Sequence, residues 1–185
     1  LDDLKETEIW ELFDDIKEKF GLRTFGKGFM YRIIPDSMIF DVSAVTDKQK
    51  LEGIKGKRTY VPYDKGDREG NRWYLKTPFY LDWSKKTVEF LVTNSGKTGA
   101  GNPVVRNKNF YFRNGFCWSD IKTVYLKCRL KDRSVYDVTS MSMFSLMPNI
   151  PDWFFVCLIN SKFISEYVND FENNTSIFQI NDVRQ

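Results

Sequence analysis

Short runs of alternating apolar and polar residues fill the middle of this 185-residue chain, whereas both ends show helical spacing. Alternation with a period of two is typical of strands, and apolar residues three or four positions apart indicate helices. Strands gathered between terminal helices favour an α+β fold. We therefore predict a mixed, mostly antiparallel β-sheet core with an N-terminal helix and C-terminal helices, in a single domain over 1–185.

The first 21 residues have the pattern of an amphipathic helix. Acidic residues begin it, Gly21 ends it, and apolar side chains recur at Leu4, Ile9, Leu12, Phe13, Ile16 and Phe20. We expect a helix over 2–20 that docks on the rest of the protein. The chain lacks an initiator Met and stops abruptly at Gln185, so we also expect it to be a domain excised from a larger chain.

A β-rich core is expected over 22–147. A turn is predicted at Pro35-Asp36, and a short helix that Thr46 and Asp47 begin and Gly53 ends. The alternating runs predict strands at 28–34, 38–42, 79–83, 88–92, 123–130 and 135–144.

The part over 148–185 is expected to be helical. Two prolines, Pro148 and Pro151, precede an apolar run that is too long for one strand. We predict one helix over 152–158 and a second over 163–171, which Ser161 caps. A short strand over 176–180 follows.

Composition excludes several functional classes. The chain has no histidine, so Ser-His-Asp and Cys-His nucleophiles and histidine-ligated metals are ruled out. Its three cysteines, Cys117, Cys128 and Cys157, lack CxxC spacing, and we interpret them as buried free thiols in a reducing cytosol. No apolar run reaches the ~18 residues of a membrane span. These features predict a cytoplasmic protein.

Three catalytic or nucleotide-binding motifs are only partly present. Gly96-Lys97-Thr98 resembles the end of a phosphate-binding loop, but the first glycine of that motif is missing. Pro35-Asp36 would suit a nuclease core, yet the acidic-x-Lys triplet at 120–122 lies too far away to share a metal. Asn102-Pro103 lacks the second proline and the aromatic residue of an amino-methyltransferase centre. We expect no catalytic residue and no metal site in this chain.

Basic residues gather in the segment 55–76. Seven basic residues stand against three acidic ones, an excess of +4, while the whole chain carries +3. Glycines and aromatic residues between them would let the backbone approach a polyanion. A charged surface loop beside core aromatics explains the composition equally well.

A second polar group surrounds the aromatic stretch 107–121. The glycine-rich loop before it offers side chains that hydrogen-bond phosphates and base edges. Within the stretch we expect a turn at Asn114-Gly115, with Phe110, Phe112, Phe116 and Trp118 fixing the loop to the sheet. The candidate DNA-binding residues of both groups are Lys57, Arg58, Lys65, Arg68, Arg72, Asn94, Ser95, Lys97, Thr98, Arg106, Asn107, Lys108 and Arg113.

Several segments occur in an order that resembles a known family. Residues 112–118 read aromatic-Arg-x-Gly-aromatic-x-Trp, 159–162 read Ile-Asn-Ser-Lys, and 173–175 form an Asn-x-Thr element. With the upstream runs 61–74 and 80–84, this set is similar to the target-recognition region of type IIG restriction–modification enzymes and related adenine-N6 DNA methyltransferases, including those of phage-defence systems. The resemblance covers most of 55–185. Isoleucine replaces the usual leucine at 159, and the proline that the family pattern places next lies beyond Gln185.

The resemblance implies that separate domains carry out catalysis and DNA recognition. A separate domain of the parent chain would bind S-adenosylmethionine and flip and methylate adenine, sometimes with a nuclease fused to it. This chain would hold double-stranded DNA against that methyltransferase domain and read base edges, without a cofactor or catalytic residues of its own. Base readers would come from Asn94, Lys97, Arg106, Asn107 and Arg113. The host compartment would be the bacterial cytoplasm.

A second hypothesis belongs to another class. The aromatic excess, 16% of residues, would also suit a protein-interaction or assembly domain of a multisubunit complex without direct base readout. An exposed apolar face on the last helices would favour it.

Overall fold

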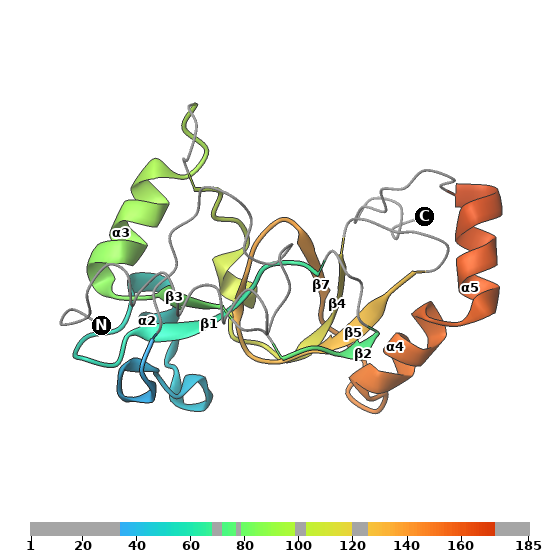
Figure 1. Cartoon of the computed structure of the whole chain (residues 1–185), viewed down its shortest axis with the longest axis horizontal. Coiled ribbons are helices and arrows are strands. Elements are labelled where there is room, and N and C mark those ends of the chain that lie inside the picture. The colour runs from blue at the N-terminus through green and yellow to red at the C-terminus, as the bar shows by residue number, and fades with distance from the viewer. Residues whose placement is uncertain (1–33, 68–71, 77–78, 99–102, 120–125, 173–185) are drawn as a thin grey trace, which may run out of the picture.

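The computed structural model describes residues 34–67, 72–76, 79–98, 103–119 and 126–172 (Figure 1). The fold is α+β, as predicted, with two mixed sheets and C-terminal helices. The predicted helix over 2–20, nearly all of the predicted strand over 28–34, the predicted strand over 176–180 and Arg68 lie outside the described residues.

The elements follow the long axis of the molecule in three groups (Figure 1). A three-stranded sheet with α2 and α3 lies at one end, a four-stranded sheet lies in the middle, and α4 and α5 lie at the other end. The helices and strands are α2 (Asp47–Glu52), β1 (Tyr60–Asp64), β2 (Trp73–Tyr74), β3 (Tyr80–Asp82), α3 (Lys85–Asn94), β4 (Gly115–Ser119), β5 (Cys128–Lys131), β6 (Val135–Tyr136), β7 (Ser140–Met143), α4 (Asp152–Ile159) and α5 (Lys162–Tyr167), which a π-helical turn over Val168–Glu172 continues.

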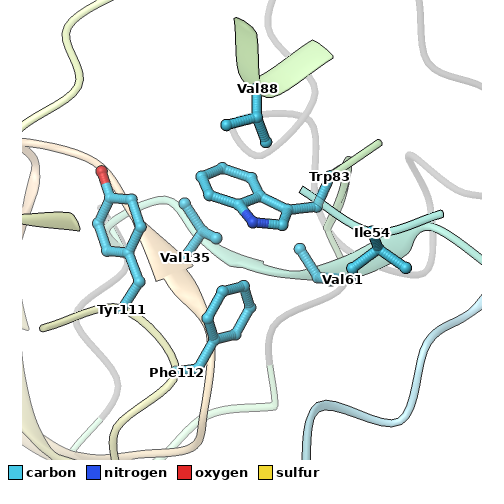
Figure 2. Packing of buried hydrophobic residues seen from close by; sticks show 7 residues of the cluster. All are labelled: Ile54, Val61, Trp83, Val88, Tyr111, Phe112 and Val135. Carbon is cyan, nitrogen blue, oxygen red and sulfur yellow. The ribbon is translucent and has the colours of Figure 1, made fainter. Parts of the chain in front are cut away.

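The three-stranded sheet has the order β3-β1-β6 and encloses the first core. Strand β1 pairs antiparallel with β3 and parallel with β6. Figure 2 shows the Trp83 indole at the centre of the buried side chains, beside Val88. Its ring meets those of Tyr111 and Phe112 edge-on, at centroid distances of 5.7 and 5.8 Å, an arrangement that the ring quadrupoles favour. The indole N–H donates to the carbonyl of Gln49 at 3.1 Å, so α2 is held to this core.

The four-stranded sheet has the order β2-β5-β4-β7 and supports the second core. Strand β4 pairs antiparallel with both neighbours and is buried along its whole length. It begins at Gly115, where an added Cβ would meet the carbonyl oxygen of Met143 on β7. Only glycine therefore fits this close approach between the strands.

The two predicted C-terminal helices are present as α4 and α5, and they pack on this second sheet. Ser161 caps α5 by accepting the Ile164 N–H at 3.2 Å. The Asn160 side chain binds the backbone of β5 twice, since its Nδ2 donates to the Cys128 carbonyl at 2.7 Å and its Oδ1 accepts the Cys128 N–H at 2.8 Å. Both residues are therefore structural.

The predicted short helix is also confirmed. Thr46 and Gln49 form a reciprocal capping box at the start of α2. The helix ends at Gly53, whose φ of 94° is the left-handed backbone that favours glycine. The predicted strands over 79–83 and 123–130 are represented by β3 and, within the described residues, by β5.

The predicted strand over 88–92 is wrong, because these residues belong to α3. Ser84 accepts the Thr87 N–H at 3.4 Å and begins the helix. Val88 is buried and Leu91, three positions on, packs against the same core. The run Val-Glu-Phe-Leu-Val fits both the two-residue period of a strand and the 3.6-residue period of a helix. The Ser84 cap, together with the packing of Val88 and Leu91 on one side, favours the helix.

Two further strand predictions in the core need correction. Over 38–42 only Ile39 pairs, in an isolated bridge with Tyr60, because Asp41 accepts the Ser43 N–H at 2.9 Å and turns the chain. The single strand predicted over 135–144 is two strands, β6 and β7, in different sheets. Asp137 accepts the Thr139 N–H at 2.9 Å and breaks the run between them.

Candidate nucleic-acid interface

The loop after α3 carries the largest group of predicted DNA-binding residues. It leaves the C-terminal end of the helix and projects from the body of the molecule (Figure 1). Its two arms meet at Ser95, whose Oγ accepts the Val105 N–H at 2.9 Å, and at Gly96, whose N–H donates to the Pro103 carbonyl at 3.1 Å. These bonds form a neck that fixes the base of the loop.

The first arm joins its side chains to the helix end. Asn94 donates from Nδ2 to the Phe90 carbonyl at 2.8 Å and accepts the Lys97 ammonium at Oδ1, 3.1 Å away. Asn94 is half-buried, whereas Lys97 and Thr98 are exposed. Ser95 and Asn94 therefore help to shape the loop, and Lys97 and Thr98 are exposed on the same arm.

The second arm returns through Arg106, Asn107 and Lys108. Asn107 adopts a left-handed backbone with φ 55°, which asparagine tolerates, and begins a 3-10 turn. Lys108 is half-buried and donates from Nζ to the Leu51 carbonyl at 3.2 Å, so it ties this turn to the end of α2. Arg106 and Asn107 are exposed.

Arg113, just before β4, lies over the exposed ring of Phe110. Its guanidinium carbon is 4.9 Å from the centroid of the Phe110 ring, which in turn stacks on Phe144 at 5.5 Å. This stacking holds a planar cation at the surface. Phe112, Phe116 and Trp118 are buried, as predicted for residues that anchor the loop, but Phe110 is 41% exposed and belongs to the surface. The predicted turn lies at Tyr111–Phe112 and not at Asn114-Gly115.

The basic segment 55–76 does not form one patch. Lys57 and Arg58 are exposed before β1, whereas Lys65 and Arg72 are half-buried beyond its other end. At about 3.3 Å per residue, the five residues of β1 span roughly 17 Å between Arg58 and Lys65. Arg72 directly precedes β2, in the other sheet. Arg68 lies outside the described residues.

Sequence reasoning missed a buried charge cluster between the two sheets. Arg129 of β5 is 2% exposed and donates from Nη2 to Oδ1 of Asp64 at 2.9 Å, while Ser140 donates to Oδ2 at 2.8 Å. The buried thiol of Cys117 lies 3.4 Å from the same carboxylate, and burial raises its pKa to about 12. Nη1 of Arg129 is buried and has no hydrogen-bond partner among the described residues.

Lys131 extends this cluster along β5. Its ammonium donates to Ser134 Oγ at 2.6 Å and lies 4.9 Å from the centroid of the Tyr136 ring. Burial lowers the pKa of Lys131 below its usual value. Charged residues at alternate positions usually face solvent, and no local signal in the sequence indicated a carboxylate 65 residues away. The two cations of β5 are therefore structural.

Two of the three cysteines lie in the interior of the protein. Cys117 and Cys128 are buried free thiols, as predicted, and burial raises the pKa of both. Cys157 is exposed on α4, so its predicted burial is wrong. No group of cysteine and acidic side chains that could hold a metal ion occurs among these residues, nor is any described helix long and apolar enough to cross a bilayer.

The chain matches none of the protein-family models and none of the curated proteins with which it was compared. Of the twelve predicted DNA-binding residues that the structure describes, those that are exposed are Lys57, Arg58, Lys97, Thr98, Arg106, Asn107 and Arg113.

Proposed function

We propose that this chain is a sequence-specific double-stranded DNA recognition domain of a bacterial adenine-N6 DNA methyltransferase of the restriction–modification or phage-defence type. It holds the target duplex for a methyltransferase domain elsewhere in the parent chain, and that domain binds S-adenosylmethionine. The chain itself carries out no chemistry. The proposed place of action is the bacterial cytoplasm.

One observation carries the proposal: a projecting loop with a fixed neck that presents exposed cationic and amide side chains. Lys97 and Arg106 supply charge for phosphates, and Asn107 offers the amide geometry that pairs with an adenine edge. Arg113, stacked on Phe110, presents a preoriented fork of the kind that binds a guanine edge. The resemblance of 55–185 to target-recognition regions supports the same function.

Selection from a random pool of duplexes tests the proposal without knowledge of the target. The domain is incubated with the pool, bound duplexes are sequenced, and the selected site is used for anisotropy titrations at several salt concentrations. We expect one enriched motif and an affinity that falls steeply with salt. Binding without an enriched motif would contradict base reading, and no binding would contradict the function.

Variants then distinguish contacts to base edges from contacts to phosphates. Arg113→Ala and Asn107→Ala are expected to relax the motif at one or two positions, with about 1–3 kcal/mol less discrimination for each lost bidentate pair. Arg58→Ala is expected to weaken all duplexes alike and to lower the salt slope by about 0.9. Lys162→Ala on α5, at the other end of the molecule, is the matched control and should change neither.

An assembly domain is the second candidate function. A specific observation favours it, namely the apolar outer surface of α4 and α5. The loop after α3 and the helices α4 and α5 lie at opposite ends of the molecule (Figure 1). A variant that abolishes DNA selection but leaves assembly unchanged would separate them.

A further inference from the structure

A series of aromatic rings continues inward from Arg113. The guanidinium carbon lies 4.9 Å from the centroid of Phe110, whose ring stacks on Phe144 at 5.5 Å with the two planes 25° apart. The Phe144 ring lies 6.2 Å from that of Tyr136, and the Lys131 ammonium lies 4.9 Å from the centroid of the Tyr136 ring. We call Arg113, Phe110, Phe144 and Tyr136 the Arg113 stack.

The rings of the Arg113 stack come from both sheets. Tyr136 belongs to β6 of the three-stranded sheet, whereas Phe144 directly follows β7 of the four-stranded sheet. The inner end is fixed in the first core, because Tyr136 meets the buried Tyr111 ring edge-on at a centroid distance of 5.0 Å. The surface cation is therefore supported by segments that are far apart in the sequence.

Gly115 makes room for the Phe144 ring. An added Cβ at Gly115 would lie 2.9 Å from Cδ1 of Phe144, so a larger residue there would displace the ring. Arg113 stands two residues before Gly115 in the chain. The close approach at Gly115 therefore also brings the backbone of Arg113 near the ring that supports Phe110.

The stack orients Arg113 and keeps its hydrogen-bond donors available. A guanidinium that stacks on a ring retains the N–H groups in its own plane for a base edge. Arg113 is exposed, so a duplex can reach these groups. A side chain that is ordered before binding loses less entropy on binding, which is worth about two- to ten-fold in affinity. That gain applies only to a base that accepts hydrogen bonds from the oriented fork.

We propose that Phe144 and Tyr136 are positioning residues for guanine recognition, which act through Phe110 to hold the Arg113 fork in the orientation that a guanine edge requires. This inference rests on the proposed DNA recognition. It adds that discrimination at one base depends on two half-buried rings, one contributed by each sheet.

Nuclear magnetic resonance of the free protein tests the stack without DNA. The Nε–H signal of Arg113, identified by its loss in Arg113→Lys, should be shifted upfield by the Phe110 ring. Phe144→Leu should move this signal toward the position of an unstacked arginine. Phe155→Leu is the matched control, because Phe155 is also half-buried and stacks on Phe116 at 5.4 Å in the second core. Urea denaturation should show a similar loss of stability in both leucine variants.

The selected duplex tests the effect on recognition. At the guanine where Arg113→Ala relaxes the motif, 7-deazaguanine removes the N7 acceptor, and the ratio of the two affinities measures discrimination. Phe144→Leu and Tyr136→Leu should lower this ratio about two- to ten-fold. The salt slope should stay unchanged, because no phosphate contact is lost. Tyr136→Phe keeps the ring and should retain the wild-type ratio, as should Phe155→Leu.

The outcomes distinguish this inference from the proposed function. A random pool without an enriched motif contradicts DNA recognition and the inference with it. An enriched motif that contains no guanine dependent on Arg113 overturns the inference alone. The same holds if Phe144→Leu leaves either the guanine ratio or the Arg113 signal unchanged. A loss that persists in an Arg113→Ala background also overturns it, because the ring would then act by another route.

Discussion

Arg129 of β5 and Asp64 at the end of β1 form a buried ion pair, 2.9 Å from Nη2 to Oδ1, that joins the two sheets. The two residues lie 65 positions apart in the sequence. The pair has Ser140 and Cys117 as further donors to the carboxylate. Its removal should therefore affect stability far more than any exposed charge.

Arg129→Met should lower the free energy of unfolding by about 3–5 kcal/mol, because the Asp64 carboxylate would stay buried without its cation. Urea denaturation measures the effect. The double variant Asp64→Leu, Arg129→Met should recover much of the loss, since no unpaired charge remains. Arg58→Met at an exposed site should stay within about 0.5 kcal/mol of wild type. A small loss for Arg129→Met would contradict the role assigned to the pair.

Asn160→Leu should destabilise the protein by about 2–4 kcal/mol. The change removes two hydrogen bonds and leaves the buried N–H and carbonyl of Cys128 without partners. Ser161→Ala, the next residue, should cost only about 1 kcal/mol through loss of the α5 cap. Chemical denaturation of both variants compares them, and equal losses would argue against the bridge from Asn160 to β5.

Cys117 should make the protein less stable at alkaline pH. Burial raises the pKa of its thiol from 9.0 to about 12. Above pH 9 the thiol ionises in the unfolded chain but not in the folded one, so its contribution to stability is complete below pH 9 and is lost progressively up to pH 12. The loss approaches roughly 1.4 kcal/mol per pH unit within that window.

Cys117→Ala should remove this contribution. Denaturation curves at several values between pH 9 and 12 should show a shallower decline of unfolding free energy for the variant than for wild type. Other groups titrate in the same range, but they are present in both proteins and cancel in the difference. Cys157→Ala at an exposed site is the control, and a slope equal to that of Cys117→Ala would refute the assignment.

Ser95→Ala should weaken binding to the selected duplex without unfolding the protein. The change removes the bond from the Val105 N–H that closes the neck of the loop, worth about 1 kcal/mol, or roughly five-fold in affinity. Anisotropy titration measures the affinity, and Ser145→Ala before α4 is the control. Unchanged affinity would show that the neck does not position the loop for DNA.

Elements with a capping signal could be predicted from the sequence. Thr46 marks the start of α2 and Gly53 marks its end. Pro151 marks the start of α4 and Ser161 marks the start of α5. These signals can be read from the sequence because helix ends are satisfied by residues that are neighbours in the chain. The run over 88–92 could not be assigned from periodicity, since its pattern fits a strand and a helix. Ser84 as a cap was the signal that would have corrected it.

The candidate site was harder to predict than the fold. Exposure of Arg106, Asn107 and Arg113 agrees with the expectation, yet Lys108 is engaged with the end of α2 and the 55–76 segment is divided between the two ends of β1. Charge alone does not distinguish a cation that faces solvent from one that binds a distant carbonyl. Such contacts depend on tertiary structure, which local patterns do not encode.

The ion pair between the sheets also has a mechanical consequence. Apolar cores can slide against each other at small cost, but hydrogen bonds to a buried carboxylate are directional and weaken steeply when they bend. The ion pair at Asp64 therefore restrains the orientation of the two sheets relative to each other. In this way it also restrains the end that carries the projecting loop relative to the end formed by α4 and α5.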